Sequence, residues 1–136
     1  MHRFVRAMVG SGRLPAALEA ELQAQGLLLY EPDLVGWVTR RRYRAPGEYT
    51  SWGKELVSGS VAVTGRRLVV WAGRFKHIDV PTGHPLRAAI EVSAEEPGRV
   101  LFGYDAGLTD PTRRGRVEVR LRTPRAADIV RLSTPG

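Results

Sequence analysis

Arginine side chains offer the clearest chemistry in this sequence of 136 residues, because they crowd into short stretches. The guanidinium group is planar and always charged, and its donors match the oxygens of phosphate and carboxylate groups. Along an extended strand, alternation would place Arg40, Arg42 and Arg44 on one face and Arg41 on the other. Two groups are therefore the candidate anion-binding residues: Arg40, Arg42 and Arg44, then Arg113, Arg114 and Arg116.

The charge balance of the whole chain points the same way. Lysine and arginine total 21 against 14 acidic residues, which gives a net charge of +7. Such an excess favours anionic partners, among them an anionic membrane surface. Nucleic acid is not favoured, because the few aromatic residues fall mostly in expected strands rather than on a stacking surface. An ordinary solvated face, with arginine enriched by a GC-rich genome, is the open alternative for each cluster.

Several other chemistries are excluded or weakly supported. The sequence has no cysteine, so disulfides, thiol catalysis and cysteine-ligated metals are excluded. It also lacks the Gly-x-Ser-x-Gly, Walker and Gly-x-Gly-x-x-Gly motifs. His77 and Asp79 would share a strand face with His84 close behind, but a surface strand followed by a turn explains them as well. We therefore predict no catalytic residue, no metal and no cofactor.

The elements that position these residues begin with a helix. Leu14, Leu18 and Leu22 recur at intervals of four and predict a helix over 13–25. Pro15 suits its first turn, and Gly26 suits the position just past its end. So short a helix needs its leucine stripe buried, either on the rest of this chain or on a partner. The three leucines are thus the candidate partner contacts.

From residue 27 the pattern changes to the alternation of strands. Strands are predicted at 34–43, 49–57, 59–64, 67–72, 75–81, 86–93, 99–104 and 115–122, and a final helix opens at Thr123 and Pro124. Both faces of 67–72 are apolar, which predicts a place between other strands. The sequence therefore predicts a mainly β fold, a barrel of about seven antiparallel strands with a C-terminal helix and an N-terminal helical arm.

One stretch resembles a known family. The run from Gly59 to Trp71, GSVAVTGRRLVVW, resembles the signature of GRAM and bacterial pleckstrin-homology-like (PH-like) domains, in which Thr64 and Arg67 match the family pattern. The resemblance covers roughly 27–132 and implies a PH-like barrel domain over 27–136, preceded by a helical arm over 1–26. The basic motif of phosphoinositide-binding PH domains is not reproduced, because the second strand offers only Lys54.

These patterns predict a non-catalytic binding or assembly module. The leading expectation is protein–protein interaction with an unidentified partner, and self-association is also open. The alternative is peripheral binding to anionic lipid or another polyanion through the arginine-rich strand. The sequence contains neither a run of about 20 apolar residues nor the apolar core of a signal peptide, so we expect a cytoplasmic protein. Under the alternative, the protein would lie at the inner membrane surface.

Overall fold

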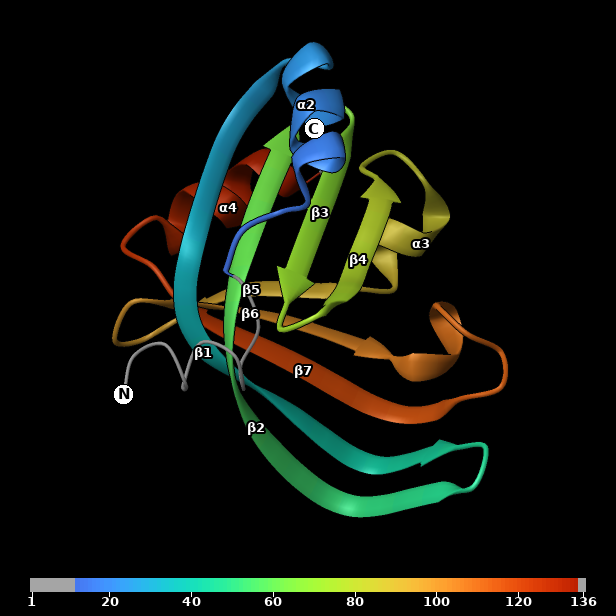
Figure 1. Cartoon of the computed structure of the whole chain (residues 1–136). Helices are drawn as coiled ribbons and strands as arrows, with labels where there is room; N and C mark the ends of the chain where they lie inside the picture. The colour runs from blue at the N-terminus through green and yellow to red at the C-terminus, as the bar shows by residue number, and fades with distance from the viewer. Residues whose placement is uncertain (1–11, 135–136) are drawn as a thin grey trace.

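The computed structural model describes residues 12–134 as a curled antiparallel sheet, a half-barrel, with helices near both ends of the chain (Figure 1). The seven strands lie in the order β4-β3-β2-β1-β7-β6-β5. The elements are α2 (Ala16–Ala24), β1 (Leu27–Ala45), β2 (Glu48–Thr64), β3 (Arg67–Ala72), β4 (Phe75–Pro81), α3 (Pro85–Ala88), β5 (Glu91–Glu95), β6 (Arg99–Asp105), η1 (Ala106–Leu108), β7 (Arg114–Arg122) and α4 (Ala126–Ser133). The predicted mainly β fold is confirmed.

The first two strands form one long bent hairpin. The stretches 49–57 and 59–64, expected as separate strands, are a single strand β2, and β1 begins seven residues earlier than predicted. Glycines permit the bend: a side chain at Gly36 would collide with the Arg120 carbonyl, and one at Gly59 with the Trp71 carbonyl. Gly59 therefore marks a close crossing within a strand and not a turn.

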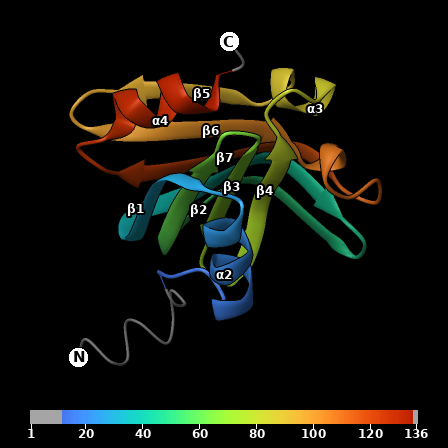
Figure 2. The same ribbon diagram turned by 90° about the horizontal axis from the view of Figure 1, so that it is seen from above.

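The main core lies on the concave face of the sheet. Val117, Val119 and Leu121 point into it from β7, as the alternation predicts. Helix α4 closes one end of this face with the fully buried Ile129, and Figure 2 shows it lying over β5 and β6. The turn into α4 is stabilised by Thr123, whose hydroxyl accepts a hydrogen bond from the Arg125 N–H at 3.0 Å.

Helix α2 packs on the convex face of the same sheet. Leu14 and Leu22 are buried against Ala62 of β2 and Val69 of β3, and Leu18 is packed partly against them. The leucine stripe thus docks on its own chain, and Leu14 and Leu22 offer no surface to a partner. The packing also explains why both faces of β3 are apolar. Of the predicted arm over 1–26, residues 1–11 lie outside the described part of the chain.

The region expected as a strand over 86–93 is different. Residues Pro85–Ala88 form the helical turn α3, because the His84 side chain accepts a hydrogen bond from the Leu86 N–H at 3.1 Å and Pro85 is set for a first turn. Strand β5 starts only at Glu91 and pairs with β6, whereas β4 pairs with β3. Within residues 12–134 no ladder joins β4 to β5, so the half-barrel stays open between them.

Candidate functional site

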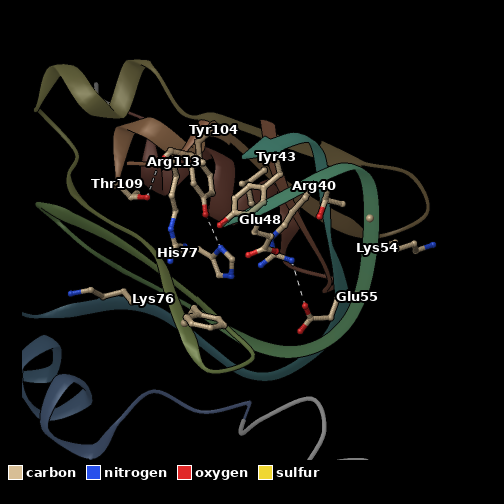
Figure 3. Close-up of a pocket in the computed structure, with 15 residues that line it drawn as sticks. Arg40, Tyr43, Glu48, Lys54, Glu55, Lys76, His77, Tyr104, Thr109 and Arg113 are labelled. Atoms are coloured by element: carbon tan, nitrogen blue, oxygen red, sulfur yellow. Dashed lines mark hydrogen bonds and ion pairs between the residues drawn. The ribbon is translucent and has the colours of Figure 1, made fainter. Parts of the chain in front are cut away.

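A cavity of about 500 Å³ occupies the concave face at the end of the half-barrel away from α4. We call this the open end; in Figure 2 it is the end where η1 and the β1–β2 turn lie. The main side chains around the cavity are Arg40, Tyr43, Glu48, Lys54, Glu55, Phe75, Lys76, His77, Tyr104, Thr109 and Arg113 (Figure 3). They come from β1, β2, β4, β6 and the segment that joins β6 to β7, so the cavity depends on the whole sheet.

A bulge in β1 decides which arginine enters the cavity. Arg42 has a left-handed backbone with φ of 50°, and the pairing of β1 with β7 shifts register between Arg41 and Arg44. As a result Arg40 and the buried Tyr43 both face the cavity, three positions apart. The expected row of Arg40, Arg42 and Arg44 on one face is therefore wrong. The Arg40 guanidinium lies 3.4 Å from Glu55 and 5.5 Å from the Tyr43 ring centroid.

A second bulge, in β4, turns His77 inward. Val70 pairs with Ile78 and Trp71 with Lys76, which leaves His77 as the extra residue. His77 and Ile78 are both buried, while Asp79 lies on the other face and binds the Arg67 guanidinium at 2.6 and 2.7 Å. His77 and Asp79 therefore do not share a face, and the described residues hold no cluster of metal-ligand type.

The His77 ring meets the Tyr104 hydroxyl across the concave face, with 2.7 Å between Nδ1 and the phenol oxygen (Figure 3). Burial, together with the positive charge of Arg40, lowers the pKa of His77 to about 4. Burial raises the pKa of Tyr104 to about 12. Both groups are therefore neutral at pH 7, and they bridge the edge strand β4 to β6.

Two guanidinium groups line the cavity, and both are accessible from it. Arg40 and Arg113 line it together with two acidic residues, Glu48 and Glu55. The ammonium groups of the two lysines are engaged elsewhere: that of Lys54 lies 4.7 Å from the Trp37 ring centroid, and that of Lys76 lies 3.1 Å from Asp79. Arg113 also contacts Asp110, at 3.4 Å, but both side chains are substantially exposed. Exposed ion pairs of this kind are weak, so the guanidinium groups can exchange these partners for an anionic ligand. The cavity can therefore bind an anion.

The remaining arginines of the first cluster lie beside the cavity. Arg44 stands opposite Tyr49 on β2 and opposite Arg114 on β7. Its guanidinium lies 5.0 Å from the Tyr49 ring centroid. Together with Arg42 and the exposed Trp52, these residues form a surface that we call the hairpin tip: Arg42, Arg44, Tyr49, Trp52 and Arg114. Within residues 12–134, no carboxylate pairs with its three arginines.

The second predicted group, Arg113, Arg114 and Arg116, is divided among three places. Arg113 reaches the cavity, Arg114 joins the hairpin tip, and Arg116 lies on the convex face. There Arg116 binds Glu91 and Glu118, and Arg41 binds Glu118 at 3.1 Å. The convex-face arginines are thus neutralised by carboxylates and are poor candidates for anion binding.

Three aromatic contributors were not expected from the sequence. Tyr43 enters the cavity through the bulge at Arg42, which alternation does not anticipate. Tyr104 ends the inward-facing series of Val100 and Phe102, and a phenol at the end of an apolar strand face is a signal that could have been used. Phe75 begins β4 with 59% of its surface exposed, at the mouth of the cavity.

No protein-family model, curated protein or solved structure matches this chain. Among residues 12–134, no helix has both the length and the hydropathy needed to cross a bilayer. Function is therefore inferred from the geometry of the open end.

Proposed function

We propose that this protein is a non-catalytic binding module that attaches to anionic membrane surfaces through the hairpin tip. The observation that carries the proposal is the placement of three arginines, which contact no carboxylate within residues 12–134, beside two exposed aromatic side chains, Tyr49 and Trp52, which are 58% and 56% exposed. Basic residues near an anionic bilayer contribute about 1 kcal/mol each. Tyrosine and tryptophan favour the membrane interface, where an apolar ring and a polar edge are both accommodated.

The hairpin tip differs from the rest of the arginine-rich surface. Most described arginines contact a carboxylate: Arg13, Arg40, Arg41, Arg67, Arg99, Arg113, Arg116, Arg120, Arg125 and Arg131. At the tip the cations are instead adjacent to one another on neighbouring strands, since Arg44 pairs in register with Arg114. Clustering cations without carboxylates is unfavourable for an isolated protein, and an anionic surface relieves it.

The proposal takes up the alternative expectation rather than the leading one. Protein–protein interaction was expected to use the leucine stripe, and the burial of Leu14 and Leu22 removes that contact. A protein partner elsewhere on the surface stays a prediction.

Vesicle sedimentation at low ionic strength tests this function. Wild-type protein should sediment with vesicles that contain phosphatidylserine and not with vesicles of phosphatidylcholine alone. Binding should fade by a few tenths molar salt, because the Debye length shrinks from about 10 Å at 0.1 M to about 3 Å at 1 M. A variant with Arg42→Ser, Arg44→Ser and Arg114→Ser should lose the binding.

The matched control removes three positive charges elsewhere, with Arg66→Ser, Arg122→Ser and Arg131→Ser, on side chains that are exposed. It should bind vesicles nearly as well as the wild type. Equal losses in both triple variants would show that only net charge matters, and the tip would then have no special role. Absence of wild-type binding to anionic vesicles would refute the function itself.

A further inference from the structure

A second cavity, of about 330 Å³, adjoins the first one. The two share Lys76, His77, Tyr104 and Thr109 in their walls, so the His77–Tyr104 bridge stands between them. Half of the ten residues that line the second cavity are aliphatic, a larger share than in the first. Lys76 and Asp79, which contact each other at 3.1 Å, also line it. Its aliphatic side chains are Ile78, Val80, Leu86, Ile90 and Leu108.

The second cavity exists because the sheet is open between β4 and β5. Helix α3 and η1 lie at this gap and contribute one leucine each, Leu86 and Leu108. Both leucines remain more than one third exposed, at 38% and 37%. An apolar group that covers both leucines would remove their surface from water, which is favourable.

The polar contacts that a ligand could make lie at the other side of the bridge. Arg40 and Arg113 line the first cavity but not the second. The carboxylates that they contact, Glu55 and Asp110, are 3.4 Å away and 56% and 39% exposed. His77 and Tyr104 are hydrogen-bonded to each other and neutral, so an alkyl chain that passes the bridge meets no charged group there. From the first cavity to the second, the wall thus offers two guanidinium groups, then the neutral His77–Tyr104 bridge, and then aliphatic side chains.

We infer that the two cavities together bind a single-chain anionic amphiphile, an alkyl chain that carries a carboxylate or phosphate. The anionic group lies between Arg40 and Arg113, and the chain passes the bridge and covers Leu86 and Leu108. Each cavity falls within the usual size range of ligand pockets, about 300–1,000 Å³. This site uses none of the charged residues of the hairpin tip, so the inference can be tested independently of membrane attachment.

Titration calorimetry with three soluble probes tests the ligand class: decanoate below its micelle concentration, butyrate, and the neutral decanol. Decanoate should bind at least about tenfold more tightly than butyrate, because burying even two further methylenes gives a tenfold gain. It should also bind at least about tenfold more tightly than decanol, which lacks the charge that Arg40 and Arg113 would contact.

Two double variants locate the two ends of the ligand. Arg40→Gln with Arg113→Gln should weaken the binding of decanoate and leave the affinity for decanol unchanged. Leu86→Asn with Leu108→Asn should weaken the binding of decanoate and leave the affinity for butyrate unchanged. The control, Arg66→Gln with Leu28→Asn, changes an exposed arginine and an exposed leucine away from both cavities and should bind decanoate normally. Circular dichroism on each variant verifies folding; all four leucine and arginine sites at the cavities are at least partly exposed, so folding should survive.

The inference is overturned if decanoate binds no better than butyrate or decanol, or if the leucine pair leaves its affinity unchanged. It is also overturned if the triple variant of the hairpin tip abolishes decanoate binding, because the probe would then be adsorbed at the tip. If the wild-type protein binds decanoate but does not bind anionic vesicles, membrane attachment is refuted and this inference is unaffected. A free amphiphile and one acyl chain of an anionic bilayer lipid share this chemistry. Loss of vesicle sedimentation in the variant with both leucine substitutions would identify the bilayer lipid as the source of the chain.

Discussion

Two single-residue bulges determine the chemistry of the open end. The left-handed backbone at Arg42 turns Tyr43 inward, and the extra residue at His77 turns its imidazole toward Tyr104. Without its bulge, each strand would place every residue beyond that position on the opposite face. A histidine and a tyrosine from β4 and β6 thus meet on the concave face, where neither carries a charge at pH 7.

The His77 ring predicts a pH dependence of stability. Its pKa is about 4 in the folded protein against an ordinary value of 6.5, so between these pH values the unfolded chain binds more protons and stability rises with pH. As the pH falls from 7 to 4, wild-type protein should lose about 3 kcal/mol from this group. Urea unfolding of wild type and His77→Gln at pH 7, 5 and 4 measures it.

The glutamine variant keeps a hydrogen-bond partner for Tyr104 but cannot be protonated. Its free energy of unfolding should therefore fall less steeply with acid than that of the wild type. Carboxylates with lowered pKa values, such as Asp79 and Glu118, also lose stabilisation in acid, but equally in both proteins. Parallel pH profiles would mean that His77 is protonated as readily in the folded chain as in the unfolded one.

Two arginines on the same strand face should differ in their effect on stability. Alternation along β7 places Arg120 and Arg122 on the same outward face, and the sequence predicts that both are exposed to solvent. In the structure Arg120 contacts Glu95 at 3.0 Å and Glu118 at 3.4 Å, whereas Arg122 is exposed. Arg120→Ser should lower the free energy of unfolding, measured by heat or urea, by about 1–2 kcal/mol, because it leaves partly buried carboxylates without this partner. Arg122→Ser should stay within about 0.5 kcal/mol of wild type, and equal effects would contradict the ion-pair account.

At the scale of the elements, α2 is part of the fold and not a loose arm. Leu22 is fully buried against the convex face of the sheet. Leu22→Ala should therefore lower the free energy of unfolding by about 2–5 kcal/mol, the range for leucine deletions in cores. Leu28→Ala is the matched control, because Leu28 is 53% exposed and should tolerate the change. A wild-type melting temperature for Leu22→Ala would show that the helix is not docked in solution.

Elements with simple alternation are the ones that the sequence predicts well. Strands β3 and β4 have the predicted bounds, and Gly26 ends α2 with φ of 86° as expected. Long bent strands are harder to predict, because the residue types that allow a strand to bend are the same ones that form turns between strands. Gly36 and Gly59 sit inside strands that cross closely, and Asp33 adopts a left-handed backbone within β1. Each of these positions looks like the end of an element when only local pattern is considered.

The candidate site was predicted in part and in the wrong grouping. Arg40 and Arg113 were both singled out from sequence, yet in separate clusters, and the structure brings them to one cavity. The grouping depends on two bulges and on the curl of the sheet. Neither leaves a local signature, since a bulge is fixed by pairing with a neighbouring strand. The partners His77 and Tyr104 are 27 positions apart and meet only through that curl.

For the molecule as a whole, charge is distributed unevenly over the surface. Arginines and carboxylates neutralise one another on the convex side of β5, β6 and β7, while the hairpin tip holds cations without carboxylates. A net charge of +7 is therefore less informative than its location. The open end would approach an anionic surface first, with the two cavities directly behind the tip.

The open sheet also predicts where the molecule is least protected and where a ligand would act. Strand β1 is paired on both sides, whereas β4 and β5 each pair with one neighbour in the described part of the chain. Backbone amides of β4, α3 and β5 should therefore exchange with deuterium faster than those of β1, β2 and β7. Decanoate should slow exchange in β4 and α3, which line the gap, and leave α2 unaffected on the convex face. Uniform slowing across all strands, or slowing at α2, would instead indicate general stabilisation or binding at another surface.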